Sequence, residues 1–213
     1  VKYEYSNYGF AILGRIVTNV SGMPYQQYVT ESILKPLGMT STTYDTHTVD
    51  AKRFAMGYRR QDNQWVEEPP LADGAFASIG GLFTTVNDFA KYMTFLLSAF
   101  PPRDEVDKGP VRRSSLREMQ QPWRQRIVAS SRVTPDAPAV SQSDGYGYGL
   151  ACGIDSVLGY SVSHGGGLPG YGTFYRLLPD CSAGIVVLTN LTYCSPAPRI
   201  DEAYVALRKT GGL

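Results

Sequence analysis

The sequence predicts an α+β fold, in which a mostly helical part, residues 1–145, precedes an antiparallel sheet and a last helix, residues 146–213. Two patterns support this division. Apolar residues recur at helical spacing in the first part, whereas four strand-like runs separated by turn residues follow in the second. Because the turns are short, we expect antiparallel neighbours. With 213 residues and no internal repeat, the chain is expected to be a single domain with its own core.

The composition argues against several functions. Lys and Arg number 20 against 19 Asp and Glu, so the net charge of +1 gives no reason to expect nucleic acid or an anionic membrane as a partner. No apolar run approaches the roughly 20 residues that a membrane span needs. The chain has no Cys-x-x-Cys and no paired histidines, so neither a metal nor a cofactor is expected. We expect Cys152, Cys181 and Cys194 to be small buried residues without a disulfide, because a predicted strand separates the last two.

The first two helices follow from caps and periodicity. Ser6 or Asn7 is suited to cap the first helix, which ends at Gly22. Its apolar residues share one face: Leu13, Ile16, Val17 and Val20. The second helix begins after Pro24 and ends before residues 36–38.

The rest of the first part alternates turns and helices. Residues 51–68 read as a hairpin that turns at 61–63. A third helix follows a capping box formed by Thr85 and Asp88, and a short helix is expected at 115–119. Residues 124–144 are polar and contain proline, so we interpret them as a long mobile loop.

The second part is a meander followed by a helix. The strand-like runs span 146–154, 160–163, 172–178 and 183–190. The last segment, about 200–208, is amphipathic and could pack across one face of the sheet.

A histidine followed by three glycines, His164 to Gly167, is the most informative stretch of the chain. Glycine in a strand loses more chain entropy than any other residue, so such a run needs a reason. A strand without Cβ atoms lets an extended substrate lie along its edge and leaves N–H groups free to face a developing oxyanion. The alternative is a glycine-rich turn with a capping imidazole.

Ser32 and Lys35 form the only Ser-x-x-Lys of the sequence. Residues three apart share a helix face, so the pair could be a nucleophile and its base. Lys35 stands at a predicted helix end, however, where a cation favours the helix dipole and stays in water. We therefore favour a structural role for this pair.

Three patterns stand in one order along the chain. They are Tyr-Ser-Asn at 5–7 with Leu-Gly-Arg-Ile-Val at 13–17, Lys-Pro-Leu-Gly-Met at 35–39, and His-Gly-Gly-Gly-Leu-Pro-Gly at 164–170. Together they resemble the serine β-lactamase and penicillin-binding protein superfamily, specifically the class C β-lactamase-like branch that includes D-aminopeptidases and esterases. Residues 80–85 and 186–190 also look like that branch, so the resemblance covers essentially all 213 residues.

The resemblance implies a β-lactamase/transpeptidase-like domain that is incomplete at its N-terminus. In this family a nucleophilic serine and a lysine come from a Ser-x-x-Lys upstream of the Tyr-x-Asn, and no such motif precedes Tyr5 here. The chain is thus expected to lack the nucleophile and the N-terminal strands of the sheet, and to be inactive alone. Its partners would be the missing N-terminal segment and a small-molecule or peptide substrate.

The resemblance also implies roles for individual residues. Tyr5 would be the general base, and Asn7 would hold the lysine and the amide oxygen of the substrate. Gly167 would give a backbone N–H to the oxyanion hole, while Gly165 and Gly166 would contact the substrate. His164 stands where many relatives have the lysine of Lys-Thr-Gly.

Histidine in place of that lysine changes the expected substrate. Lysine is a permanent cation that suits a substrate carboxylate, whereas histidine is mostly neutral at pH 7. The replacement at His164 therefore weakens a β-lactamase assignment and favours peptidase, amidase or esterase activity. Relatives of this kind often work outside the cytoplasm, so the resemblance implies a periplasmic or secreted location, although a cytoplasmic one remains open.

Two other functions remain open. One is a non-catalytic module or pseudoenzyme that keeps the groove beside His164 to bind a peptide. The other makes Ser32 or Cys152 a nucleophile paired with His164, and no local signature supports either residue.

Overall fold

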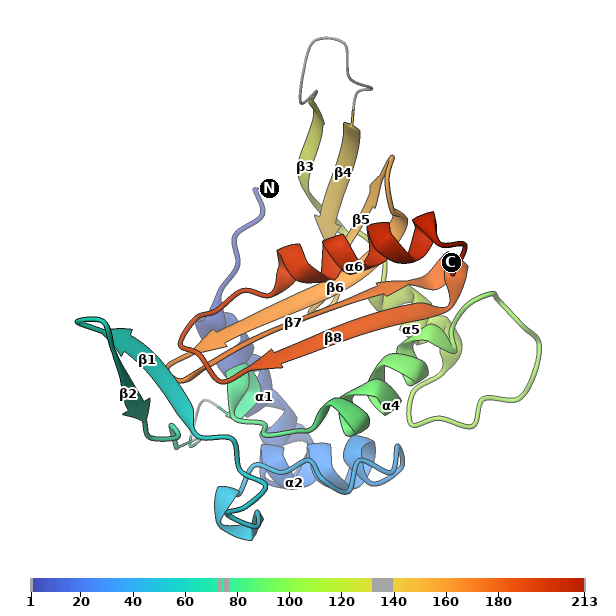
Figure 1. Cartoon of the computed structure of the whole chain (residues 1–213). Helices are drawn as coiled ribbons and strands as arrows, with labels where there is room; N and C mark the ends of the chain where they lie inside the picture. The colour runs from blue at the N-terminus through green and yellow to red at the C-terminus, as the bar shows by residue number, and fades with distance from the viewer. Residues whose placement is uncertain (1, 73, 75–76, 132–139, 213) are drawn as a thin grey trace.

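Six strands in a single antiparallel meander form the centre of the computed structural model, which describes residues 2–72, 74, 77–131 and 140–212 (Figure 1). The strands follow each other in sheet order as they do in sequence. They are β3 (Arg124–Ser131), β4 (Val140–Tyr146), β5 (Ala151–Asp155), β6 (Gly159–Leu168), β7 (Tyr171–Leu178) and β8 (Ala183–Thr189). The prediction of antiparallel strands with short links is confirmed.

The interpretation of residues 124–144 as a mobile loop is wrong. β3 and β4 pair from Arg124 opposite Tyr146 to Ser131 opposite Val140, while residues 132–139 of the predicted loop lie outside the described part. This hairpin projects from the sheet (Figure 1), and exposed positions predominate along β3. A strand solvated on both faces needs no apolar–polar alternation, which is why periodicity missed it.

The strand predicted over 146–154 is in fact two strands joined by a tight turn. Tyr146 ends β4, and the N–H of Gly147 donates to the carbonyl oxygen of Leu150 across the turn at 2.8 Å. β5 then begins at Ala151, opposite Tyr146. Glycine permits this sharp reversal, since Gly149 has φ +75°.

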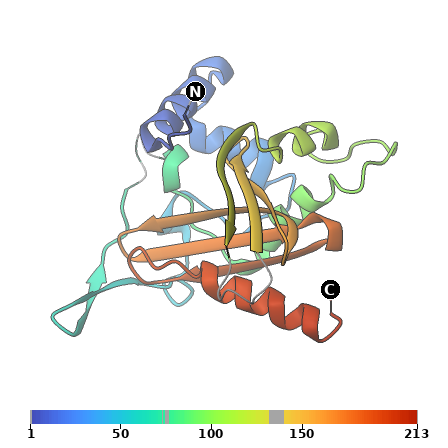
Figure 2. The ribbon, with the colours of Figure 1, turned by 90° about the horizontal axis from the view of Figure 1, so that it is seen from above.

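Helices cover both faces of the sheet. α4 (Val86–Leu97) and α5 (Arg113–Met119) lie on one face, and α6 (Ala197–Lys209) crosses the other (Figures 1 and 2). Fully buried side chains fill the first interface: Leu96, Leu116, Val162 and Leu177. A second cluster of buried residues fills the interface with α6: Leu158, Leu178, Ile200 and Tyr204. The predictions of a capped third helix, of a short helix at 115–119 and of a final amphipathic helix are confirmed.

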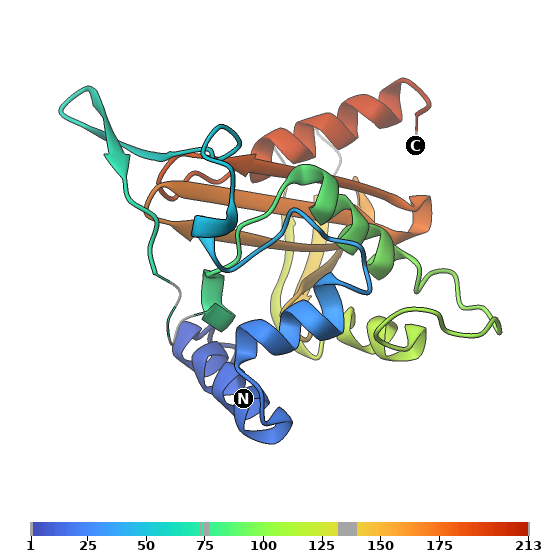
Figure 3. The same cartoon turned by 90° about the horizontal axis from the view of Figure 1, so that it is seen from below.

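The remaining helices form a lobe at the edge of the sheet (Figure 3). It consists of α1 (Asn7–Ser21), α2 (Tyr25–Val29), the π-helical η1 (Thr30–Leu34) and the short α3 (Ala77–Gly80). α1 and α3 approach closely, because the hydroxyl of Ser78 donates to the carbonyl oxygen of Phe10 at 2.9 Å. A Cβ atom at Gly14 would lie 2.3 Å from that hydroxyl oxygen, so α1 needs glycine there.

The first helix begins and ends where the sequence predicts. Ser6 is the N-cap, its hydroxyl accepts from the N–H of Gly9 at 3.0 Å, and Gly22 ends the helix at φ +70°. The apolar face is largely uncovered, however. Leu13 is 55% exposed, Ile16 49% and Val20 83%.

The predicted hairpin of residues 51–68 is present, with shorter strands. β1 (Gly57–Gln61) pairs with β2 (Gln64–Glu68), and Asp62 and Asn63 form the turn at positive φ. Two further short 3-10 helices are η2 (Thr46–Thr48) and η4 (Pro179–Cys181).

All three cysteines are free, as predicted, but only one is fully buried. Cys152 is buried, Cys194 is half-buried and Cys181 is exposed in η4, so the expectation of burial is wrong for Cys181. Cys181 lies in the turn after β7, and the position of this turn at the surface exposes the thiol despite its apolar character. Among the described helices, none has the length and apolar character to cross a membrane.

Candidate active site

The glycine run lies in a strand, so the alternative of a glycine-rich turn is wrong. His164, Gly165, Gly166 and Gly167 belong to β6 and pair with β7 from Tyr175 to Gly172. On the other side, β5 begins at Ala151 opposite Ser163, so its pairing with β6 stops before His164. The three glycines are exposed. Between His164 and Leu168, β6 therefore offers a backbone edge along which an extended substrate could lie.

Tyr5 and His164 meet at the start of this edge, although they are far apart in sequence. The rings of Tyr5 and His164 have centroids 6.2 Å apart, and Tyr5 also packs on Phe10 at 5.6 Å. The cap at Ser6 fixes Tyr5 just before α1 and makes Asn7 the first helical residue, which is exposed. Local capping thus places Tyr5 against His164 and leaves the side chain of Asn7 exposed at the start of α1.

Gly167 lies farther along the strand than His164. Three residues of a strand span about 10 Å, so Gly167 and Tyr5 mark two ends of the candidate site. A Cβ atom at Gly167 would lie 2.8 Å from Cδ1 of Tyr193, so a larger residue would have to displace that ring. The lack of a side chain at this position is therefore a packing requirement as well.

Tyr146 is a site residue that sequence reasoning missed. Its hydroxyl lies 2.9 Å from Nε2 of His164, and its ring centroid is 6.1 Å from that of Tyr5. The sequence feature that could have identified Tyr146 is the glycine on each side of it. A Cβ at Gly145 would meet Pro122 at 2.5 Å, and one at Gly147 would meet the carbonyl oxygen of Met119 at 2.1 Å. This tight approach holds the end of β4 against the loop after α5.

An arginine that forms an ion pair packs against the rings of Tyr3 and Tyr146. Nε and Nη2 of Arg126 donate to the two carboxylate oxygens of Asp144 at 2.5 and 2.7 Å. The register of β3 shifts between Gln125 and Ile127, so Arg126 sits in a bulge. Its guanidinium lies over the rings of Tyr3 and Tyr146, at 5.4 and 5.6 Å.

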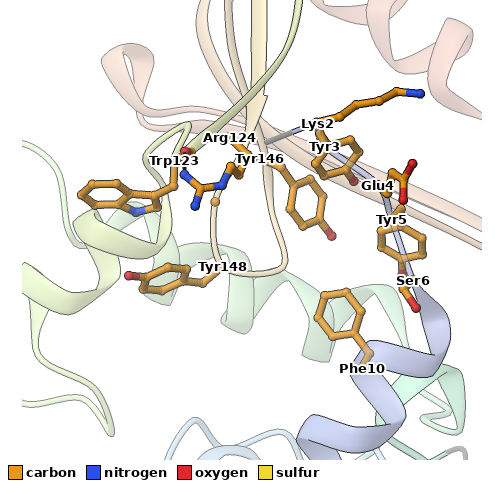
Figure 4. A pocket seen from close by; sticks show the side chains of 11 residues that line it. Lys2, Tyr3, Glu4, Tyr5, Ser6, Phe10, Trp123, Arg124, Tyr146 and Tyr148 are labelled. Carbon is orange, nitrogen blue, oxygen red and sulfur yellow. Dashed lines mark hydrogen bonds between the residues drawn. The ribbon is translucent and has the colours of Figure 1, made fainter.

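A pocket of about 570 Å³ opens next to Tyr5 (Figure 4). The N-terminal segment forms one wall, and the β4–β5 turn with the loop after α5 forms the other. Aromatic side chains dominate the lining, with Lys2, Glu4 and Arg124 at its rim in Figure 4. The aromatic lining residues are Tyr3, Tyr5, Phe10, Trp123, Tyr146 and Tyr148. His164, Asn7 and the three glycines do not line this pocket, so it adjoins the glycine edge without including it.

Burial sets the protonation of the site. It raises the pKa of Tyr5, with a further increase from Tyr3, and it also raises the pKa of Tyr146. Burial lowers the pKa of His164, a hydrogen bond to the backbone of Gly165 opposes this, and the charge of Arg126 lowers it further. At neutral pH the site therefore holds two phenols and a neutral imidazole, as we expected for His164.

Neither Cys152 nor Lys35, the candidate base for Ser32, has an environment that would activate it for catalysis. The side chain of Lys35 is 63% exposed, so it stays in water as predicted, and its Nζ forms a surface ion pair with Oε1 of Glu31 at 2.6 Å. Burial raises the pKa of Cys152 to about 11, which keeps it a thiol. Among the described residues, no group of His, Cys, Asp and Glu side chains is arranged to hold a metal ion.

Two curated relatives match most of the chain. Protein flp of Staphylococcus aureus (strain MRSA252) is 30% identical over 190 residues, which cover 89% of this chain and 34% of that protein. The unguisins hydrolase ungD' of Aspergillus campestris (strain IBT 28561) is 28% identical over 201 residues, with 91% and 34% covered. The chain thus spans about a third of the length of these relatives.

Solved structures share the fold. The octameric penicillin-binding protein homologue from Pyrococcus abyssi is 27% identical with a TM-score of 0.68, covering 89% of this chain and 39% of that one. A penicillin-binding protein from Bacillus halodurans is 24% identical with a TM-score of 0.71, covering 97% and 56%. The D-stereospecific amidohydrolase from Streptomyces sp. is 21% identical with a TM-score of 0.65, covering 96% and 55%.

The family comparison agrees with the motifs and with the fold. The profile described as Beta-lactamase matches residues 1–209, nearly the whole chain. The order of Tyr5-x-Asn7 and the His164 glycine run, the antiparallel sheet with helices on both faces and the structural neighbours all point the same way. This chain belongs to the beta-lactamase family.

Proposed function

We propose that this chain forms the tyrosine and glycine-strand part of a serine hydrolase site that works through an acyl-enzyme. The observation that carries the proposal is the meeting of Tyr5 and His164 beside an open backbone edge of β6. A tyrosine that can relay a proton and a row of free N–H groups are two requirements of acyl transfer. The third, an activated nucleophile, we place outside these 213 residues.

Each site residue has a defined part in this proposal. Tyr5 takes the proton of the nucleophile, and Asn7 binds the substrate amide oxygen and the lysine that accompanies the nucleophile. Gly165 and Gly166 align the substrate along β6, and the N–H of Gly167 contributes to the oxyanion hole. A tyrosine with a raised pKa is a poor base, so Tyr5 needs a cation close by, which the incoming lysine would supply.

The uncovered face of α1 supports a missing segment next to Tyr5. Leu13, Ile16 and Val20 lie on the helix that starts two residues after Tyr5. Exposed apolar side chains grouped on one face are typical of surfaces that another element covers. A segment that packed there would bring its own residues close to the phenol of Tyr5.

The neutral imidazole of His164 favours uncharged groups at its position. We therefore infer amides, D-peptides or small esters as substrates ahead of β-lactams, which carry a carboxylate. The hydrolase and amidohydrolase among the similar proteins are consistent with this class. By the same resemblance we propose a periplasmic or secreted location.

The test compares the chain with a longer form that also carries the coding sequence upstream of it. We expect the longer form to hydrolyse p-nitrophenyl acetate and to react with a fluorophosphonate probe, while residues 1–213 alone do neither. In the longer form, Tyr5→Phe should lower kcat/KM about 100-fold or more, as loss of a general base does.

Tyr58→Phe is the matched control, because Tyr58 lies on the β1–β2 hairpin and its hydroxyl donates to Oε1 of Glu67 at 3.4 Å. It should leave kcat/KM unchanged. Equal activity of the short and long forms, or an active Tyr5→Phe variant, would contradict the proposal.

A binding module is the second candidate, and the protonation of Tyr5 favours it. Burial and Tyr3 both raise the pKa of Tyr5, and the described part of the chain holds it as a phenol, which binds ligands but does not abstract protons. The aromatic pocket beside it could hold a peptide side chain. If the longer form binds a D-amino-acid dipeptide by calorimetry yet never labels with fluorophosphonate, this candidate replaces the hydrolase.

A further inference from the structure

We propose that Tyr146 is a positioning residue that holds His164 neutral, in a single tautomer with its proton on Nδ1. Its importance for turnover rests on the proposed hydrolase function. The hydrogen bond and the tautomer do not, and both can be measured on residues 1–213 alone.

The geometry places one hydroxyl on one ring nitrogen. Tyr146 ends β4, pairs with Ala151 of β5, and Ala151 in turn pairs with Ser163, the neighbour of His164. The pairing of β5 with β6 stops before His164, and past this end of β5 the phenol reaches Nε2 of His164 at 2.9 Å. The two ring centroids lie 6.0 Å apart with the planes at 63°, so the contact is made edge to face.

The direction of the hydrogen bond follows from the protonation of its partners. The raised pKa of Tyr146 keeps its hydroxyl protonated, and the lowered pKa of His164 keeps the imidazole neutral. A neutral imidazole has one donor and one acceptor nitrogen. The hydrogen bond to the backbone of Gly165 raises the pKa of His164, the direction expected when a ring N–H donates to a carbonyl oxygen. Nε2 is then the acceptor, and Tyr146 is the donor.

The surrounding charges agree with this assignment. Side chains from every neighbouring element face the pair: Tyr3 and Tyr5 from the N-terminal segment, Arg126 from β3, Asp144 from β4, Cys152 from β5 and Tyr175 from β7. Arg126 and Asp144 form a bidentate ion pair, and the charge of Arg126 lowers the pKa of His164. Burial raises the pKa of Tyr5, raises that of Cys152 to about 11 and raises that of Tyr175, so these three side chains are neutral at pH 7. Asp144, the carboxylate among these side chains, is paired with Arg126 and is not free to stabilise an imidazolium.

The consequence concerns substrate choice. At neutral pH, Nε2 accepts a hydrogen bond from a phenol, so His164 carries no charge to pair with a carboxylate. It presents an uncharged imidazole at the start of the glycine edge. The substrate group that contacts His164 is therefore neutral. This narrows the proposed substrates to amides and esters without a carboxylate at that position.

Nitrogen-15 NMR of the histidine side chains in residues 1–213 tests the proposal directly. We expect Nε2 of His164 to show the shift of an unprotonated, hydrogen-bonded nitrogen and Nδ1 that of a protonated one. Tyr146→Phe keeps the ring contact with Tyr3, at 5.2 Å, and removes only the hydroxyl. Because that hydroxyl stabilises the neutral form, its loss should raise the pKa of His164, by about one pH unit for a lost hydrogen bond.

His47 is the internal reference, since it is the second of the two histidines and lies exposed in η2. Tyr58→Phe is the matched variant, because its hydroxyl contacts Glu67 at 3.4 Å on the β1–β2 hairpin. The spectrum of His47 should be unchanged in Tyr146→Phe, and the spectrum of His164 should be unchanged in the matched variant. A proton on Nε2 in the unaltered chain, or an unchanged His164 pKa in Tyr146→Phe, overturns the proposal.

Activity of the longer form separates this proposal from the hydrolase function. If that form is active, Tyr146→Phe should move the acidic limb of the kcat/KM profile to higher pH by the shift that NMR measures, and Tyr58→Phe should not. If that form is inactive while the NMR results hold, the hydrolase function fails and the positioning of His164 stands.

Discussion

α4 and α1 carry almost the same sequence signals but meet different surroundings. Both begin at a hydroxyl cap, Thr85 and Ser6, and both have apolar residues at helical spacing. In α4 that stripe packs on the sheet, with Leu96 fully buried, whereas in α1 Leu13 is 55% exposed. Capping and periodicity thus determine that a helix forms and which face is apolar. They do not determine whether the described chain supplies the surface that covers the face.

Leu96→Ala should have the largest effect, because Leu96 is fully buried beneath the sheet. Truncation of a buried leucine costs about 2–5 kcal/mol, from lost transfer energy and the cavity left behind. Urea unfolding at pH 7, followed by circular dichroism, measures the change. A loss under about 1 kcal/mol would mean that this interface is not the core.

Asp88→Asn sharpens the comparison with a buried polar contact of α4. The carboxylate of Asp88 accepts from the N–H of Ser41 at 2.6 Å and from the hydroxyl of Thr42 at 2.9 Å, and it pairs with Lys91 at 2.7 Å. Burial alone would raise the pKa of Asp88, but the contacts with Lys91, Ser41 and Thr42 outweigh it and lower that pKa. We expect a loss of about 1.5–3 kcal/mol at pH 7, the usual range for hydrogen bonds to a charged group.

The pH dependence of that loss has a definite sign. A carboxylate with a lowered pKa stabilises the native state above its unfolded pKa of about 4, and the stabilisation disappears as the pH falls through the folded value. The difference between Asp88→Asn and the unaltered chain should therefore shrink from pH 7 to pH 3. Asp104→Asn, at an exposed position, is the control and should show no such trend.

Leu13→Ala combined with Ile16→Ala should have the smallest effect. Both side chains are about half exposed, so the double variant of residues 1–213 should lose less than about 1 kcal/mol. In the longer form, where we propose that a segment covers α1, the same substitutions should cost about 2 kcal/mol or more. Equal small losses in the two forms would show that nothing packs on this face.

The parts of the fold that sequence predicted are those with local signals. Ser6 and Gly22 bound α1, and Asp62 with Asn63 turns the β1–β2 hairpin, because caps and left-handed turns depend on one or two residues. The β3–β4 hairpin was missed because its solvated strands bury no regular face. Tyr146 was missed for another reason: its contact with His164 joins two strands that are not neighbours in the sheet, and no local spacing encodes such a contact.

The candidate site was predictable only as separate motifs. The residues Tyr5, Asn7 and His164 to Gly167 were found by type and order, and the structure brings Tyr5 to His164 while Gly167 stands farther along β6. Their roles remain proposals. The support of Arg126 depends on a bulge in β3, which the sequence Arg-Gln-Arg-Ile does not mark.

The contact between Gly57 and Gly170 explains how the far end of the glycine strand keeps its place. A Cβ at Gly57 would lie 2.7 Å from Cα of Gly170, so the two main chains touch with no room even for a methyl group. The backbone of the β1–β2 hairpin thus packs directly against the turn between β6 and β7 and limits its movement. A Cβ atom at Gly57 would push that turn away, so Gly57→Ala measures how much displacement the glycine edge of β6 tolerates.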